Sequence, residues 1–573
     1  MASSEPTTYD VIVLGGALAG ASMALLLRRH LPTLRVLVLE RNPAFDWKVG
    51  ESTVEISSYF LTRVLRQYDY LSREQLPKHG LRWWFHNGAV RRLREASELG
   101  PSQLPRLPSF QLDRAKLDEH VLAEAVREGA ELWRPAKIVD VRLPEETGSP
   151  LGLVRVERGN ETLDLHARWV VDASGRAAVI ARKRGWLHPL KEHPTTAIWA
   201  RYRNVKDLDG PQVAGIDPAD GWARSVPCSR RLATNHFTGY GYWIWFIPLH
   251  GGEVSVGVVW DRRMVEPKGK SPAERLDWFL LGNPLSRELI EGAERVPDDL
   301  RQYAHLPYLV DRVAGPGWSL VGDAAGFLDP FYSPGIDQIS YSVSWSLELI
   351  RRSQKNPDPA EFAKAIEMHS KCYTQFFRYF FESVYQDKYA VMGDFDLMTA
   401  DMLIDTCYYY FFNVWPAYLG KDPCLLQPPY YPPHAKYGKP LLSFPHRRLV
   451  SLALRKLRLG VYGNHNSGRR PNIIGFTLGS GSLATFLKGV GFWLRAELAN
   501  LAWYLVAPRP RRSAMPGPMT DPARLDAPGA DAGIPAAAEP DLEAVTVDGR
   551  AAQQACEAEA SAPKEMASPD PES

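Results

Sequence analysis

The sequence predicts an α/β fold, in which a doubly wound, Rossmann-type domain is interleaved with a strand-rich domain and followed by a helical C-terminal region. Three observations predict it. Residues 9–40 follow the order apolar strand, glycine-rich turn, helix, apolar strand. Two later apolar strands, at 167–172 and 318–321, each end in small residues and an acid. Residues 190–310 alternate as strands do, whereas residues 340–420 are aromatic-rich and look helical.

The glycine-rich turn lies where a dinucleotide site would lie. The segment GGALAG follows an apolar strand and opens a helix that runs to about His30. Gly15 allows a tight turn and Gly20 allows close packing of helix on strand, while the helix N-terminus offers free N–H groups to a pyrophosphate. A carboxylate at the end of the second strand can accept from ribose hydroxyls. The candidate cofactor-binding residues are Gly15, Gly16, Ala17, Ala19, Gly20 and Glu40; the alternative is a glycine-rich turn without a ligand.

Three later segments favour FAD over NAD as the cofactor. WVVDASGR ends in Asp172 to Arg176, LVGDAAGF holds Gly322 and Asp323, and LDR precedes a helix at Arg114. This layout resembles the FAD-dependent monooxygenase superfamily. The resemblance implies that Asp323 meets the ribityl chain and pyrophosphate of the flavin and that Arg114 reaches the cofactor.

Two longer motifs are more specific. The run GYWIWFIPLHGG contains Trp-x-Trp-x-Ile-Pro, and FLDPFYSPG matches Phe-x-x-Pro-x-x-Ser-x-Gly. Together with GES, which ends at Ser52, they resemble the flavin-dependent halogenase family of tryptophan-halogenase-like enzymes. The resemblance spans roughly residues 9–350. The motif residues are Trp243, Trp245, Ile247 and Pro248 in the first signature and Phe327, Pro330, Ser333 and Gly335 in the second.

The resemblance implies a reaction. A separate NAD(P)H:flavin reductase supplies FADH₂, which reacts with O₂ to give a C4a-hydroperoxide. Halide attacks it, and the resulting hypohalous acid travels through a tunnel to an aromatic or otherwise electron-rich substrate. Large, stiff side chains at Trp243 and Trp245 would keep the organic substrate away from the flavin and keep the oxidant dry. The alternative is that both indoles are ordinary core residues of a strand.

Lys78 is the candidate catalytic residue. The family uses one lysine between flavin and substrate, as a chloramine carrier or as a donor that polarises hypohalous acid. Lys78 is the only lysine between Lys48 and Lys116, and it precedes an apparent strand at 81–85. A lysine must be partly desolvated to be nucleophilic near neutral pH, and the aromatic strand could supply apolar surroundings. The alternative is a solvated loop lysine that follows Pro77.

Two positions depart from the family pattern. Tryptophan-acting members carry a glutamate where this chain has Tyr332, which argues against free tryptophan as substrate. The family binds halide on backbone N–H groups of the Ser-x-Gly segment, here Ser333 and Gly335. The residue between them is Pro334, which has no N–H, so Gly335 alone or with Ile336 has to serve. The resemblance also places Gly335 and Ile336 beside the cofactor.

Other activities stay open at this point. One is a monooxygenase or reductase that acts on a lipid-like substrate with the halogenase framework, and another is a flavin-binding protein without turnover. Halide dependence separates the first from halogenation, and a spectrum before and after anaerobic reduction tests the second. The sequence leaves open whether the small-molecule substrate is carried on another protein, and nothing in it points to a nucleic acid.

Cysteine usage and hydrophobicity indicate the cellular compartment. The five cysteines, Cys228, Cys372, Cys407, Cys424 and Cys556, are scattered and form no CxxC, so neither a disulfide framework nor a metal site is expected. The N-terminus lacks the pattern of a signal peptide, and no strongly apolar run of 18 residues is free of charge. We therefore expect a cytoplasmic protein.

The sequence predicts the domain organisation. We expect residues 1–350 to form the FAD-binding domain, with the substrate domain interleaved at about 80–110 and 190–310, and residues 351–512 to be helical.

Charge divides the C-terminal part of the chain. Residues 447–512 carry 12 basic and one acidic residue, a net charge of +11, interleaved with apolar runs. They predict peripheral contact with an anionic membrane or an acidic partner, or alternatively a helical cap docked on the enzyme. Residues 513–573 carry a net charge of −9 and no aromatic residue, and are expected to be disordered.

Overall fold

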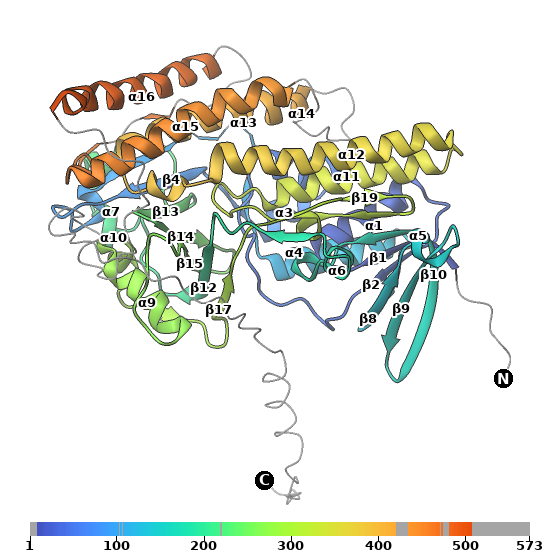
Figure 1. Ribbon diagram of the computed structural model, residues 1–573. Helices are drawn as coiled ribbons and strands as arrows, with labels where there is room; N and C mark the ends of the chain where they lie inside the picture. The colour runs from blue at the N-terminus through green and yellow to red at the C-terminus, as the bar shows by residue number, and fades with distance from the viewer. Residues whose placement is uncertain are drawn as a thin grey trace, which may run out of the picture. The chain divides into compact units, whose positions relative to one another are not determined.

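The computed structural model describes residues 8–101, 104–105, 107–217, 220–419, 434–469, 472–473 and 481–506. All of them belong to one unit, Met1–Gly529. The tail at 513–573, which the sequence predicts to be disordered, lies outside the described residues. Two sheets and a layer of helices make up this unit (Figure 1).

The first sheet is the doubly wound sheet that the sequence predicts. Its parallel strands run in the order β20 (Trp318–Leu320), β10 (Glu161–Asp172), β1 (Thr8–Leu14), β2 (Val36–Leu39) and β7 (Glu131–Trp133). β19 (Ala314–Gly315) adds antiparallel to β20, and β8 (Lys137–Arg142) and β9 (Gly152–Arg158) form an antiparallel extension on β10. β2 is buried along its whole length, as expected for a parallel strand covered on both faces. The predicted α/β class is confirmed.

Two helices flank this sheet near its glycine-rich turn. α1 (Leu18–His30) follows β1 directly and packs against α4 (Arg114–Arg127) and α11 (Gly335–Ser353). Asp113 caps α4 by accepting from the amides of Ala115 and Lys116. The sequence therefore located both helices to within a residue or two.

The second sheet gathers strands from distant parts of the chain. Its order is β16 (Glu294–Arg295), β12 (Thr195–Arg203), β15 (Val254–Asp261), β14 (Tyr242–Pro248), β13 (Thr234–Gly239), β4 (Leu81–Phe85), β5 (Ser97–Pro101) and β21 (Asn472–Ile473), with β17 (Arg301–Ala304) also on β12. β13 and β4 are parallel, so the loop before β4 lies beside the start of β13. This sheet contains most of the strands between residues 80–110 and 190–310.

Shorter elements connect these layers. The helices are α2 (Glu55–Tyr59), α3 (Tyr68–Glu74), α5 (Pro144–Thr147), α6 (Val179–Lys183), α7 (Pro211–Ala214), α8 (Gly221–Arg224), α9 (Pro272–Gly282) and α10 (Pro284–Ile290). The strands are β3 (Leu76–Pro77) paired with β6 (Phe110–Gln111), and β11 (Leu187–Pro189) paired with β18 (Tyr308–Val310). Their pairing ties the loops around the first sheet to the second.

Long helices cover both sheets on one side (Figure 1). They are α11, α12 (Pro359–Phe380), α13 (Phe395–Tyr409), α14 (Trp415–Leu419), α15 (His434–Arg458) and α16 (Gly481–Val506). π-Helical turns occur at Phe60–Val64, Phe381–Tyr385 and Tyr410–Val414, and the last two continue α12 and α13. The predicted helical region is thus built mainly of aromatic-rich helices that continue past residue 420.

The described parts of the basic segment at 447–512 belong mainly to α15 and α16. α16 packs on α13 and α15, with Gly489 so close to Leu403 and Ile404 that a Cβ would lie 3.0 Å from Leu403. Glu497 pairs with Arg448 of α15 at 2.8 Å. One face of this segment is therefore docked on the enzyme, as the cap alternative expects.

The described residues contain neither a membrane-spanning helix nor a cluster of metal-ligating side chains. In the described part of the chain, no helix combines the length and apolarity needed to cross a bilayer. Cys228, Cys372 and Cys407 are buried, and Cys424 and Cys556 lie outside the described ranges. Among the residues with a described placement, no group of three or more His, Cys, Asp or Glu side chains could hold a metal.

Candidate active site

The turn after β1 requires glycine at two positions. Gly15 has φ = +102°, and a Cβ there would lie 2.6 Å from the carbonyl oxygen of Ala173, at the end of β10. A Cβ at Gly20 would lie 1.9 Å from the carbonyl oxygen of Gly15. Both contacts are with backbone, which cannot yield, so these glycines let two strand ends and α1 meet at one point.

The same turn leaves backbone donors available. Ala17 is the N-cap of α1 and has no side chain that can cap the first-turn amides. The Glu40 carboxylate accepts from the amides of Gly16 and Asn42, at 2.8 Å each. An uncapped helix N-terminus beside a fixed carboxylate suits a pyrophosphate followed by a ribose. The predicted residues around this turn therefore fit a dinucleotide such as FAD.

The Gly-Asp turn after β20 lies against this site. A Cβ at Gly322 would be 3.0 Å from Cβ of Ala19, on α1. Asp323 follows in the 3₁₀ turn Gly322–Ala325, and its backbone oxygen accepts from Tyr308 Oη at 2.6 Å. Burial raises the pKa of the Asp323 carboxyl. The fold thus brings Asp323 and the glycine-rich turn together from opposite ends of the domain.

Arg114 braces the segment that contains GES. Its guanidinium donates to Asp118 at 3.0 Å and to the carbonyls of Val49 and Gly50 at 3.3 and 3.4 Å. Lys48 contacts the same Asp118 at 2.5 Å. Arg114 therefore holds the 48–50 loop against α4, and its known contacts are with protein.

Lys78 is buried, with 3% of its surface exposed. Its Nζ donates to Ser52 Oγ at 2.7 Å and to the Thr53 carbonyl at 2.5 Å. Burial lowers the pKa of Lys78 to about 7, against the opposing effect of the charges on Glu55 and Asp337. The solvated-loop alternative is therefore wrong. GES and the lysine meet because Ser52 bridges to Gln111 of β6 (Phe110–Gln111), with which β3 (Leu76–Pro77), just before Lys78, also pairs.

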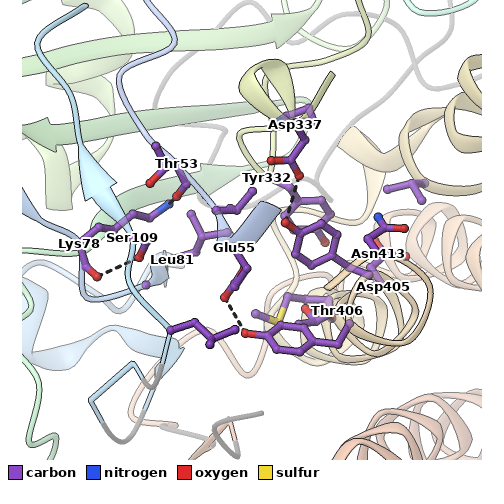
Figure 2. A pocket seen from close by; sticks show the side chains of 18 of the residues that line it. Thr53, Glu55, Lys78, Leu81, Ser109, Tyr332, Asp337, Asp405, Thr406 and Asn413 are labelled. Atoms are coloured by element: carbon purple, nitrogen blue, oxygen red, sulfur yellow. Dashed lines mark hydrogen bonds between the residues drawn. The ribbon is translucent and has the colours of Figure 1, made fainter. Parts of the chain in front are cut away.

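A cavity of about 190 Å³ opens beside Lys78 (Figure 2). Thr53, Glu55 and Lys78 line it from the N-terminal part of the chain, and Asp337 lines it from α11. Residues between Gly80 and Ser109 and the turn at Tyr332 add to this wall. The helical region supplies a further part, including Phe376, Phe380, Tyr385, Met402, Thr406, Tyr409, Tyr410 and Asn413. Sequence reasoning missed this wall; the dense aromatic run at 376–418 was the signal that could have indicated it.

The paired indoles lie behind the cavity. Trp243 and Trp245 are 3% and 5% exposed, and their ring centroids are 5.6 Å apart. Neither lines the cavity, but Trp243 packs on Phe331 at 5.3 Å, which packs on the cavity residue Tyr332 at 4.5 Å. Ile247 and Pro248 complete the buried strand. Phe331 and Tyr332 therefore separate the first indole from the cavity.

A buried polar chain fixes the first indole. Trp243 Nε1 donates to Tyr389 Oη at 2.9 Å, and Tyr389 donates to Asp329 at 2.8 Å. His193 Nε2 lies 3.0 Å from the same Asp329 oxygen. Three residues that no sequence motif marked thus hold the orientation of Trp243.

The predicted halide segment is a tight turn that ends on a helix. Tyr332 and Ser333 have left-handed φ values of 71° and 59°, and the Ser333 amide donates to the Pro330 carbonyl at 2.9 Å. α11 begins at Gly335, beside which a Cβ would meet nothing within 4 Å. The Ser333 amide is therefore engaged, so Gly335 and Ile336 carry the amides that remain for an anion.

Tyr332 rests on a buried charge cluster. Lys388 Nζ lies 5.0 Å from the Tyr332 ring centroid and donates to Asp401 at 2.5 Å and Asp405 at 2.6 Å. His446 Nδ1 lies 3.3 Å from Asp401, whose charge raises the pKa of His446 against the effect of burial. The cluster joins α13 and α15 under the cavity.

Comparison with known proteins agrees with these motifs. The chain matches the tryptophan halogenase family model over residues 89–389, slightly more than half of its length. It is 27% identical over 445 residues to flavin-dependent halogenase chlA of Dictyostelium discoideum, covering 72% of this chain and 71% of the relative. It is 25% identical over 385 residues to a tryptophan 2-halogenase of Chondromyces crocatus, covering 64% and 65%.

Solved structures show the same fold. Halogenase PltM, in complex with phloroglucinol and FAD, aligns with a TM-score of 0.65 at 16% identity, over 86% of this chain and 96% of that one. The myxobacterial chondrochloren halogenase CndH aligns with a TM-score of 0.55 at 23% identity, over 68% and 83%. The family match also extends to residue 389, past the 350 residues in which the sequence showed its resemblance. This chain belongs to the tryptophan halogenase family of flavin-dependent enzymes.

Proposed function

We propose that this protein halogenates a small, electron-rich aromatic compound with halide, O₂ and FADH₂ supplied by a separate NAD(P)H:flavin reductase. The observation that carries the proposal is Lys78, which is buried beside the cavity and has a pKa lowered to about 7. A lysine in that state can act near neutral pH either as an amine or as a proton donor. FAD, when bound and reduced, supplies with O₂ the oxidising power that converts halide into hypohalous acid.

The chain's own residues would bind the cofactor, act on hypohalous acid and exclude water and organic substrate. Gly15, Gly20 and the N-terminus of α1 would hold the pyrophosphate, and Glu40 the ribose. Lys78 would either polarise hypohalous acid by donating from its ammonium or carry the halogen on its amine. The layer formed by Trp243 and its neighbours excludes water and organic substrate from the region behind the cavity.

The decisive assay measures halide-dependent product. The protein is supplied with FADH₂, O₂ and chloride or bromide, and an electron-rich phenol traps hypohalous acid. A halogenated phenol that requires halide supports the proposal. A halide-independent oxygenated product would instead support the monooxygenase alternative, and no turnover of bound flavin would support a binding protein.

The cavity limits the size of the substrate. A protein cavity of roughly 150 Å³ accommodates benzene, and the cavity beside Lys78 is about 190 Å³. This volume suits a single substituted ring, and the complex of PltM with phloroglucinol has a ligand of that size. Tyr332, where tryptophan-acting members carry glutamate, disfavours free tryptophan. A ring carried on another protein is compatible with the same cavity.

Replacing Pro334 with serine or alanine is expected to tighten halide binding. Either change gives the turn an N–H next to Gly335, and a hydrogen bond to a charged acceptor contributes about 1.5–3 kcal/mol, or roughly ten- to a hundredfold in affinity. The measurement is the fraction of FADH₂ consumed that yields halogenated product rather than H₂O₂ as halide is varied. Both variants should gain alike, because the amide and not the side chain is responsible; no gain in either contradicts the backbone-donor proposal.

We also propose that α16 rests on an anionic membrane surface. Its outward face carries five exposed leucines, and Lys488 and Arg495 each follow one of them directly. α16 is part of the segment at 447–512, which has a net charge of +11. Basic residues near anionic lipid contribute about 1 kcal/mol each. The leucines are Leu483, Leu487, Leu494, Leu498 and Leu501, each more than half exposed.

Flotation with anionic vesicles tests this surface. The wild type is expected to float at low salt and less at high salt, because salt screens the basic residues. The double variant Leu494→Glu/Leu498→Glu should lose flotation. Leu281→Glu, on an equally exposed leucine of α9, should float like the wild type. If the double variant floats unchanged, α16 does not contact the membrane.

A further inference from the structure

The α11 side of the cavity holds polar atoms that lack a protein partner. Gln338, Tyr341 and Asn413 line the cavity and are 3%, 3% and 7% exposed. Across the described ranges, no hydrogen-bond partner reaches Gln338 Nε2, Tyr341 Oη or Asn413 Oδ1. Burying such a group without a partner costs about 1–3 kcal/mol. Three such polar groups in one cavity indicate a ligand that offers both hydrogen-bond donors and acceptors.

Asp337 lies among them as a fixed acceptor. It occupies the first turn of α11 and is 5% exposed. Ser57 Oγ donates to one carboxylate oxygen at 2.5 Å, and Tyr409 Oη donates to the other at 3.0 Å. An ionised carboxylate has about four acceptor sites, so the two hydroxyls and the Ser57 amide leave one site for a ligand. The carboxylate is therefore oriented by protein on one side and able to accept from a ligand on the other (Figure 2).

On the basis of the proposed halogenation, we propose that Asp337 accepts the hydroxyl proton of a phenolic substrate, while Gln338, Tyr341 and Asn413 bind a second oxygen substituent on its ring. The two carboxylates Asp337 and Glu55 would repel a ring that bears a carboxylate. The occupant is then a neutral phenol with at least two oxygen substituents.

The acidities of Asp337 and of a phenol suit transfer of the hydroxyl proton. Burial raises the pKa of Asp337 to about 7, and the charge of Glu55 adds to the effect. A phenol has a pKa of about 10. The gap is small enough for the proton to move as the ring loses electron density in the reaction, whereas an indole or alkyl ether has no comparably acidic proton.

The chemical step balances without a further reactant. The phenol O–H proton moves to Asp337 as the oxygen electron pair pushes through the ring and a C–X bond forms to the halogen of hypohalous acid. The X–O bond breaks, and its electron pair leaves with the oxygen, which becomes water by taking a proton from the Lys78 ammonium. The ring then gives the proton of the substituted carbon to the Lys78 amine, and Asp337 returns its proton to the phenol oxygen. One C–H bond is replaced by C–X, and one water is formed.

Ligand binding without turnover tests the assignment. Resorcinol and its dimethyl ether are titrated calorimetrically into protein that holds oxidised FAD. Resorcinol should bind the wild type roughly tenfold or more tightly than the ether, because a hydrogen bond to a charged acceptor is at stake. Asp337→Asn should remove most of that difference while leaving ether binding unchanged. Glu361→Gln, at an exposed acid in the first turn of α12, is the matched control and should bind both ligands like the wild type.

The pH dependence of binding gives a second readout. Phenol binding needs the Asp337 carboxylate, so resorcinol affinity should fall as pH drops through about 7. Ser57→Ala removes a donor to that carboxylate and should move the midpoint to higher pH. Other titratable groups share this cavity, so Asp337→Asn isolates the share of Asp337. They are Glu55, Lys78, Tyr332, Tyr341, Tyr385, Asp405, Tyr409 and Tyr410.

These results separate the two proposals. If Asp337→Asn binds resorcinol as tightly as the wild type, or Ser57→Ala leaves the midpoint in place, the assignment of Asp337 is wrong. Should Asp337→Asn not fold, the midpoint in Ser57→Ala decides. Binding that behaves as expected in a protein that makes no halogenated product would overturn the proposed function and leave the phenol site standing.

Discussion

Replacing Gly15 with valine is expected to abolish FAD binding. The residue has φ = +102°, and a Cβ would lie 2.6 Å from the carbonyl oxygen of Ala173. The left-handed conformation costs roughly 1–2 kcal/mol for a residue with a side chain, and the clash forces the turn away from β10. Displacing the turn moves the N-terminus of α1, whose amides would hold the pyrophosphate. Flavin absorbance of protein reconstituted with FAD and then desalted measures the loss.

A matched glycine separates the site from general strain. Gly148 also has a positive φ, of 63°, but a Cβ there would meet nothing within 4 Å. Gly148→Val meets the same left-handed strain without a clash, so it should unfold at a somewhat lower temperature but bind FAD like the wild type. If Gly15→Val retains wild-type FAD affinity, the glycine-rich turn is not the pyrophosphate site.

Replacing Lys78 with alanine is expected to lower halogenated product by about a hundredfold or more, the scale typical of a lost acid–base group. Lys78 lines the cavity where hypohalous acid would meet substrate, so it acts after O₂ has reacted. Reoxidation of FADH₂ by O₂ should therefore keep its wild-type rate. Stopped-flow absorbance measures reoxidation, and chromatography measures product in the same reaction.

The outcome for flavin reoxidation decides the role of the lysine. Lys364→Ala, at an exposed lysine of α12, should match the wild type in both measurements. If Lys78→Ala mainly slows reoxidation of FADH₂, the lysine acts on the flavin side and not on the halogen. If product formation is unchanged, Lys78 has no part in the reaction.

The first sheet and its turn could be predicted because their signals are local. Glycines of fixed spacing between an apolar strand and a helix encode a conformation that few other sequences adopt. The structure has β1, α1 and β2 in the predicted order, and α1 ends at the predicted His30. The Trp-x-Trp-x-Ile-Pro run likewise formed the predicted strand, since aromatic and β-branched residues suit a pleated surface.

The cavity could not be predicted, because its wall joins residues that are far apart along the chain. Ser57 and Asp337 are 280 residues apart, and Tyr410 bonds Glu55 across 355 residues. No spacing in the sequence records such contacts. They arise where helices from the C-terminal half pack over the loop that follows β2.

Sequence alone therefore determined the α/β class, the dinucleotide turn and the family, all of which rest on short motifs with fixed local geometry. Only the tertiary structure decided that Lys78 is buried, that the Ser333 amide is already engaged and that α16 docks on α13 while turning leucines outward. The physical reason is that burial and pKa depend on what packs around a side chain. For Lys78 and Asp337, those neighbours come from elements that only the folded chain brings together.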